Sequence, residues 1–205
     1  MLAIIDYGAG NLRSVQKACQ LLGADATITS DAKTIEKADH VILPGVGAFG
    51  DCIQSLHQTG LTDVVRHAAK SGKPFLGICL GMQLLFESSE ETPGVEGLGI
   101  FQGEIVKIPK QEGCKIPHMG WNSLHFPKET PLFAGLPENS FVYFVHSYYA
   151  KPKDPSIVAA TTSYCGELTV ALQQGNLFAT QFHPEKSGDV GLSILKNFIE
   201  AGGNL

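Results

Sequence analysis

Several features that would point to other classes of protein are missing from this sequence. Its 205 residues contain no stretch near the roughly 20 apolar residues that a membrane-spanning helix needs. Lysine and arginine form no run, and the net charge is -5, so we expect neither a membrane nor a nucleic acid as partner. The first residues lack the positive leader of a signal peptide. The composition, 43% hydrophobic and 17% charged, is that of a globular protein, and one domain over residues 1–205 is the simplest expectation.

Cysteine is sparse as well, and no two cysteines form a C-x-x-C pair. The five are Cys19, Cys52, Cys79, Cys114 and Cys165. An odd and scattered set argues against a disulfide framework and against a zinc site, and it favours a reducing cytoplasm. We therefore expect each cysteine to be either a buried packing residue or a reactive thiol. We expect no metal or other cofactor.

The order of apolar segments predicts the fold class. Strand-like runs at 2–6, 26–29, 41–43 and 74–79 alternate with helical periodicity, clearest at 11–22 and 61–69. After Gly97 the runs become short and are separated by Gly, Pro and Asn, until a last helical segment at about 190–201. We predict an α/β fold: a mostly parallel, doubly wound sheet with helices on both faces and an antiparallel extension in the second half.

The segment GICLG at residues 77–81 is the cysteine version of the nucleophile elbow G-x-S-x-G. An apolar strand precedes it, and a helix is predicted from Leu80 to about Glu87. At this turn Cys79 would begin the helix, where free N–H groups and the helix dipole favour a thiolate, and the Leu80 N–H would be an oxyanion donor. Gln83 lies one helical turn further on, within reach of a substrate. The alternative is a small buried cysteine at a tight turn.

A candidate base follows the apolar run that ends at Phe182. His183 and Glu185 are separated by Pro184, which keeps the chain extended there, so the two side chains point to the same side. A carboxylate beside the imidazole would fix its tautomer and stabilise its charged form. The alternative is a surface histidine in a proline turn.

A glycine-rich loop, PGVG at residues 44–47, closes the third apolar strand. It can turn backbone N–H groups inward, so Val46 and Gly47 are candidates for the second oxyanion donor; an ordinary strand-to-helix turn is the alternative. Near the N-terminus, Gly8 and Gly10 suggest a dinucleotide motif, but Arg13 stands where its third glycine belongs, and we reject that site.

Three segments together, PGVGAFG (44–50), GICLGMQLLFE (77–87) and QFHPEKSG (181–188), resemble the class I, or triad, glutamine amidotransferases. Their order along the chain is also that of the family. The resemblance implies a triad of Cys79, His183 and Glu185. It also implies four residues that hold L-glutamine: Gly47, Gln83, Ser147 and Tyr148.

The rest of the chain resembles one branch of that family, the glutaminase subunits of imidazole glycerol phosphate synthases in histidine biosynthesis. The segments that carry this are IDYGAGNL (5–12), PHMGWN (117–122) and YFVHSY (143–148). The resemblance implies a heterodimer with a barrel-shaped cyclase, which uses the ammonia to make imidazole glycerol phosphate and an aminoimidazole carboxamide ribonucleotide. Residues expected near that partner are Asn11, Trp121, Asn122, Tyr143 and Lys186. For Trp121 and Tyr143 the alternative is core packing.

Three other functions remain open at this point. The first is a glutaminase subunit of another pathway, such as vitamin B6 synthesis, which would share the triad and differ in its partner. The second is a stand-alone γ-glutamyl cysteine hydrolase, which would act without a partner. The third is a regulatory binding subunit without catalytic activity, in which the triad pattern would be a coincidence.

Overall fold

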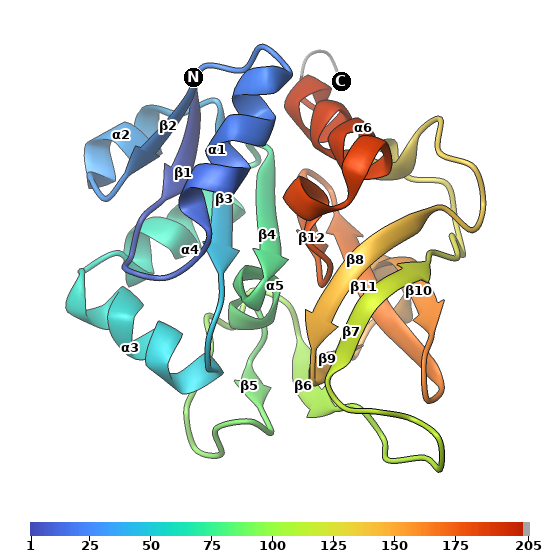
Figure 1. The fold of residues 1–205 in the computed structure, drawn as a ribbon. Helices are drawn as coiled ribbons and strands as arrows, with labels where there is room; N and C mark the ends of the chain where they lie inside the picture. The colour runs from blue at the N-terminus through green and yellow to red at the C-terminus, as the bar shows by residue number, and fades with distance from the viewer. Residues whose placement is uncertain (203–205) are drawn as a thin grey trace.

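The computed structural model describes residues 1–202, and Figure 1 shows a central sheet with helices on both sides and a two-stranded ribbon beside it. Five neighbouring strands of the sheet run parallel in the order β2-β1-β3-β4-β12. These strands are β1 (Leu2–Ile5), β2 (Ala26–Thr29), β3 (His40–Gly45), β4 (Phe75–Cys79) and β12 (Leu177–Thr180). The carboxyl ends of β3, β4 and β12 therefore meet at one edge, where α/β proteins place their sites.

Helices cover both faces of the parallel strands, as the alternating pattern predicts. On one face lie α1 (Leu12–Leu21) and α6 (Gly188–Glu200), next to each other in Figure 1. The other face carries α2 (Ala32–Lys37), α3 (Phe49–Gln58), α4 (Thr62–Lys70) and α5 (Leu80–Leu84). Successive residues of β1 enter different cores, Ile4 with α1 and α6 and Ile5 with the other helices. None of the helices within residues 1–202 is long and apolar enough to cross a membrane.

The second half of the chain extends the sheet with antiparallel strands, which confirms the predicted fold class. The antiparallel strands β11, β9 and β6 follow β12 in the sheet, and β10 pairs with β11; β5, from the first half of the chain, closes the edge parallel to β6. Their bounds are β5 (Ser88–Ser89), β6 (Gly103–Lys107), β9 (Tyr148–Pro152), β10 (Val158–Ser163) and β11 (Glu167–Gln174), with 3₁₀ turns at Pro131–Phe133, Pro155–Ile157 and Pro184–Lys186. A separate antiparallel ribbon contains β7 (His118–Ser123) and β8 (Phe141–His146). Only Ser147 separates β8 from β9, so the chain changes sheets at that residue.

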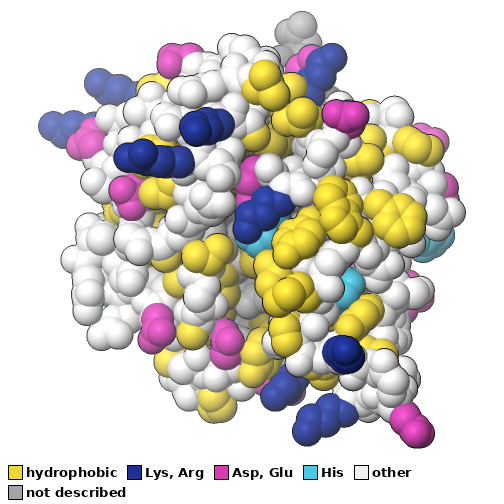
Figure 2. Space-filling view, in the orientation of Figure 1, with side chains coloured by type: hydrophobic (Ala, Val, Ile, Leu, Met, Phe, Trp, Pro, Cys, Tyr) yellow, Lys and Arg dark blue, Asp and Glu magenta, His cyan; other side chains and the backbone are white. Residues whose placement is uncertain are grey.

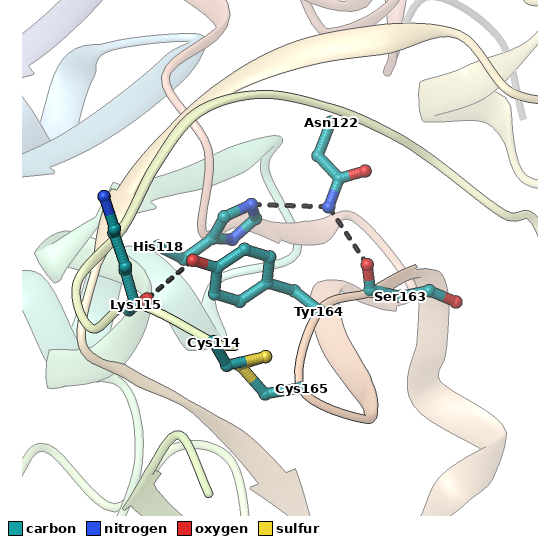
Figure 3. Close-up of a disulfide and its surroundings, with 7 residues drawn as sticks. All are labelled: Cys114, Lys115, His118, Asn122, Ser163, Tyr164 and Cys165. Atoms are coloured by element: carbon teal, nitrogen blue, oxygen red, sulfur yellow. Dashed lines mark hydrogen bonds between the residues drawn. A yellow bond between two sulfur atoms is a disulfide. The ribbon is translucent and has the colours of Figure 1, made fainter. Parts of the chain in front are cut away.

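The expectation of no disulfide is wrong for one pair of cysteines. Cys114 and Cys165, which are 51 residues apart, form a disulfide with a Cα–Cα distance of 5.9 Å, a usual spacing for such a bond. It joins the loop before β7 to the turn between β10 and β11 (Figure 3). The spacing along the chain gave no signal of this pair, because the fold alone brings the two segments together. The remaining three cysteines are free and buried.

Candidate active site

Cys79 occupies a tight turn between a strand and a helix. It is the last residue of β4 and the N-cap of α5, with φ 55° and ψ -111°, a backbone conformation that is strained for a residue with a side chain. Two residues after Cys79 only glycine fits, because a Cβ on Gly81 would lie 1.9 Å from the Leu43 carbonyl oxygen. This close approach of α5 to β3 holds the turn in place. The local geometry is that of a nucleophile elbow.

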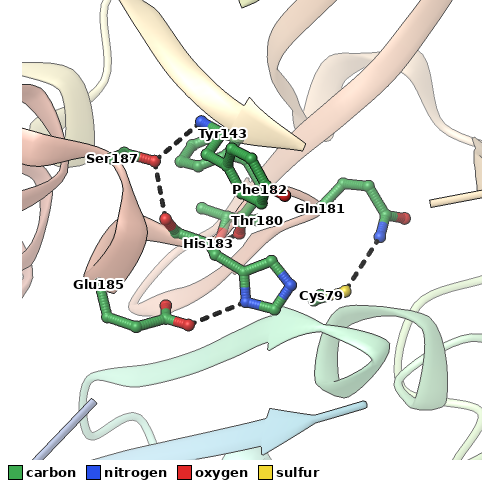
Figure 4. A network of polar contacts seen from close by, with 8 residues as sticks. All are labelled: Cys79, Tyr143, Thr180, Gln181, Phe182, His183, Glu185 and Ser187. Carbon is green, nitrogen blue, oxygen red and sulfur yellow. Dashed lines mark hydrogen bonds and ion pairs between the residues drawn. The ribbon is translucent and has the colours of Figure 1, made fainter. Parts of the chain in front are cut away.

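His183 and Glu185 form a buried pair directly after β12. The distance from His183 Nδ1 to Glu185 Oε1 is 2.9 Å, and the two side chains are only 3% and 1% exposed. The opposite edge of the imidazole is turned toward Cys79 in Figure 4, and its Nε2 makes no hydrogen bond with any group in residues 1–202. Because β12 and β4 are parallel neighbours, the three predicted triad residues come together at the carboxyl ends of these strands.

Two polar residues that were not expected from the sequence hold Cys79 and His183 in place. The Ser187 hydroxyl donates to the His183 carbonyl oxygen at 2.7 Å and accepts from the Tyr143 N–H at 3.0 Å. The Gln181 side chain, fully buried, donates through Nε2 to Cys79 Sγ at 3.7 Å. Both lie within the motif QFHPEKSG, but residue spacing does not reveal which way a side chain points.

The surroundings of His183 favour its charged form. Burial acts to lower the pKa of His183, but the contacts with Cys79 and Glu185 outweigh burial and raise the pKa to about 9. At neutral pH the ring is therefore an imidazolium between a carboxylate and a sulfur atom. An imidazolium in this place is able to donate a proton to a leaving group at Cys79.

The raised pKa of His183 predicts a pH-dependent stability. Because the folded-state pKa of about 9 exceeds the unfolded value of 6.5, this histidine contributes stability that is fully present below pH 6.5 and is lost as the pH rises through about 9. Urea unfolding at a series of pH values should therefore show a falling free energy of unfolding over this window. In the His183→Gln variant the fall should be smaller. Equal falls in the two proteins would contradict the shifted pKa.

A cavity of about 330 Å³ opens at the thiol, a size typical of small-molecule sites. Every residue predicted to hold glutamine or the oxyanion lines it together with Cys79 and His183: Val46, Gly47, Leu80, Gln83, Ser147 and Tyr148. The side chain of Gln83 lies deeper than expected and donates to Gln181 Oε1 at 2.9 Å. A larger cavity of about 800 Å³ lies over residues 126–138, but no cysteine, serine or histidine lines it.

The loop after β3 stands directly beside the elbow. Gly45 is the register partner of Cys79 across the two parallel strands, so Val46 and Gly47 follow at the level of the thiol. The Val46 carbonyl oxygen accepts from Cys52 Sγ at 3.5 Å. Because the C=O and N–H of one peptide point in opposite directions, the Gly47 N–H faces away from Cys52. The role of the Val46–Gly47 loop as the second oxyanion donor stays a prediction.

The residues expected near a partner differ from one another in how exposed they are. Trp121 is 55% exposed on β7, so core packing, the alternative reading, is wrong for this residue. Tyr143 is half-buried on β8, with its ring centroid 6.2 Å from that of Trp121. Lys186 is exposed and Asn11 is half-buried. Asn122 is half-buried, and its amide donates to the Ser163 carbonyl oxygen at 3.1 Å.

Comparisons with known proteins show the family of this chain. The family model of the class-I glutamine amidotransferases matches residues 3–201. The imidazole glycerol phosphate synthase subunit HisH of Caldanaerobacter subterraneus subsp. tengcongensis is 54% identical over 200 residues, 98% of each chain. The HisH subunit of Moorella thermoacetica is 52% identical over 97% of this chain and 94% of its own. The PurLQS structure from Thermotoga maritima shares the fold, with a TM-score of 0.75 at 19% identity over 97% of each chain. This chain therefore belongs to the class-I glutamine amidotransferase family.

Proposed function

We propose that this chain is the glutaminase subunit of an imidazole glycerol phosphate synthase and hydrolyses L-glutamine to glutamate and ammonia. The observation that carries the proposal is the buried group of Cys79, His183 and Glu185 at a cavity of about 330 Å³. The identity of 54% to a HisH subunit supports the choice of pathway, histidine biosynthesis. We further propose one glutamine amidotransferase domain over residues 1–205 and a cytoplasmic location, which the free thiol of Cys79 supports and the Cys114–Cys165 disulfide does not.

The first half of the reaction forms a thioester. The Cys79 thiolate attacks the amide carbon of glutamine, and the electrons of the C=O bond move to the oxygen. The Leu80 N–H and a backbone N–H of the Val46–Gly47 loop stabilise this oxyanion, and loss of one such donor costs about 100–1,000-fold in rate. When the C–N bond breaks, the His183 imidazolium gives its proton to the nitrogen, and ammonia leaves.

The second half of the reaction hydrolyses the thioester. His183, now neutral, takes a proton from a water molecule, whose oxygen attacks the thioester carbon. The C–S bond then breaks, glutamate leaves, and the thiolate and imidazolium are restored. Glu185 transfers no proton; it holds the ring through its 2.9 Å hydrogen bond and stabilises the positive charge.

The outer face of the β7–β8 ribbon is the proposed contact with a cyclase subunit in a heterodimer. Met119 and Phe141 are 63% and 54% exposed, and together with Trp121 they lie on the face that also carries Tyr143 and Val145. Figure 2 shows hydrophobic side chains gathered there. Exposed apolar patches of this kind mark binding surfaces. Val145 also lines the cavity at Cys79, so ammonia would have a short route to the partner.

The test is glutamate release from glutamine by the purified chain, alone and with a cyclase subunit that carries its nucleotide ligand. We expect a low rate alone and a strong increase in the complex. A full rate without the cyclase would instead favour a stand-alone γ-glutamyl hydrolase. Activation by a partner from vitamin B6 synthesis, and not by the cyclase, would move the chain to that pathway.

A further inference from the structure

The wall of the cavity at Ser147 and Tyr148 stands where the chain leaves one sheet for another. Strand β8 ends at His146 and β9 begins at Tyr148, so the backbone between them loses its regular ladder partners. The Ser147 carbonyl oxygen accepts from the Ile108 N–H at 3.0 Å. The Tyr148 carbonyl oxygen is held by two side chains, His146 through Nδ1 at 2.8 Å and Gln83 through Nε2 at 3.4 Å. Tyr148 pairs with Lys107 of β6, and side chains hold its carbonyl oxygen.

A second buried histidine continues the chain of hydrogen bonds. His118 Nδ1 lies 2.9 Å from His146 Nε2, and the Asn122 amide lies 3.3 Å from His118 Nε2. The carbonyl oxygen of Tyr148 can only accept, so the proton of His146 is on Nδ1 and its Nε2 accepts. His118 must then carry its proton on Nδ1 and accept from Asn122 through Nε2. One set of tautomers satisfies all four ring nitrogens.

Both imidazoles are neutral in this arrangement. Burial lowers the pKa of His118 to about 4, and burial is also the main cause that lowers the pKa of His146 to about 3. The His118 ring stacks on Tyr164 with a centroid distance of 3.9 Å and on Phe144 at 4.6 Å. Tyr164 is adjacent to the disulfide-bonded Cys165 (Figure 3). Aromatic rings thus pack against His118, while His146 lines the cavity.

The same network reaches the sulfur of Cys79. Gln83, which donates to the Tyr148 carbonyl oxygen, also donates to Gln181 Oε1 at 2.9 Å, and Gln181 donates to Cys79 Sγ at 3.7 Å. Hydrogen bonds therefore connect the Tyr148 backbone and the thiol. A shift of the Tyr148 backbone would therefore disturb both the cavity wall and the Gln181 side chain next to the sulfur.

We propose that His118 and His146 are positioning residues of the glutamine site, a neutral imidazole pair that fixes the Ser147–Tyr148 wall of the cavity. This inference rests on the proposed function, because it takes that wall to bind glutamine. Neither histidine exchanges a proton with the substrate. Their effect is on substrate binding, through the backbone that they hold.

The test replaces His146 in two ways, in the complex with the cyclase. His146→Leu removes both hydrogen bonds, and we expect the KM for glutamine to rise about 10-fold or more while kcat changes less, since the half-buried Tyr148 carbonyl oxygen loses the closer of its two side-chain donors. His146→Asn keeps a donor at the position of Nδ1 and should restore KM to within about 3-fold of wild type. The exposed His67→Leu variant is the matched control and should behave as wild type.

Labelling of Cys79 gives a readout independent of turnover. His146→Leu should react more slowly than wild type with an electrophilic glutamine analogue and at an unchanged rate with iodoacetamide, which does not use the glutamine wall. If His146→Leu does not fold, His118→Leu takes its place, because it removes the donor to His146 Nε2 and should also raise KM. His118→Asn, which keeps a donor at the position of Nδ1, is then the variant expected to restore KM. An unchanged KM in a folded variant would overturn the inference, as would a fall in kcat alone. A wild-type complex that releases no glutamate would overturn the proposed function itself.

Discussion

Replacement of Cys79 by alanine is expected to abolish glutamate release and to leave the fold and cyclase binding intact. In the proposed mechanism the thiolate forms the covalent bond on which both halves of the reaction depend, and loss of a nucleophile of this kind lowers kcat by about 10⁶-fold. Cys79 is buried at the end of β4, but removal of one sulfur atom leaves the strained turn and its glycines in place. Glutamate release should be measured with the complex, and folding should be followed by thermal unfolding.

The matched control for this variant is Cys19→Ala. Cys19 is also buried and free, but it lies in α1 and does not line the cavity. We expect it to retain activity. If Cys79→Ala retained glutaminase activity while folded, the assignment of the nucleophile would be wrong.

The His183→Ala variant is expected to lose nearly as much activity as Cys79→Ala, about 10⁶-fold in kcat, because the proton donor and the base are removed together. Glu185→Gln should cost less, about 10⁴-fold, since the ring keeps a neighbour able to hydrogen-bond but loses the negative charge that stabilises it. Steady-state glutamate release in the complex measures both variants.

The control for the charge change is Glu104→Gln, which removes an exposed carboxylate 3.4 Å from Lys151, away from the cavity. It should leave kcat unchanged. A loss from Glu185→Gln that equals or exceeds the loss from His183→Ala would contradict the division of roles, because an orienting residue cannot matter more than the group it orients.

The proximity of Cys79, His183 and Glu185 was predictable from the sequence because the constraints on it are local. The elbow needs glycines two residues on either side of Cys79, and the pairing of His183 with Glu185 needs only an extended chain through Pro184. Parallel strands then bring the two segments to the same edge of the sheet. The parallel half of the fold was predictable for a similar reason, since its strands and helices alternate along the chain.

Features that depend on distant segments were not predictable. The disulfide joins residues 51 apart, and His118 meets His146 only because β7 and β8 pair.

The end of α5 also differs from the prediction: the helix stops at Leu84, not near Glu87 as expected. There the carbonyl oxygens of Leu84 and Leu85 accept from the Leu98 and Ile100 N–H groups instead of continuing the helix. Strand β7 was missed because Gly120 and Asn122 interrupt its apolar pattern.

The most direct test of the proposed glutaminase chemistry is the site of covalent labelling by a chloroketone analogue of glutamine. In this reaction an S–C bond forms and chloride leaves, so the labelled residue is the one that attacks at the glutamine position. We predict a single label, found by mass spectrometry on the peptide that contains Cys79, prevented by excess glutamine and absent from Cys79→Ala. Labelling of Cys19 or Cys52 instead, or no labelling of a protein that releases glutamate, would contradict the account.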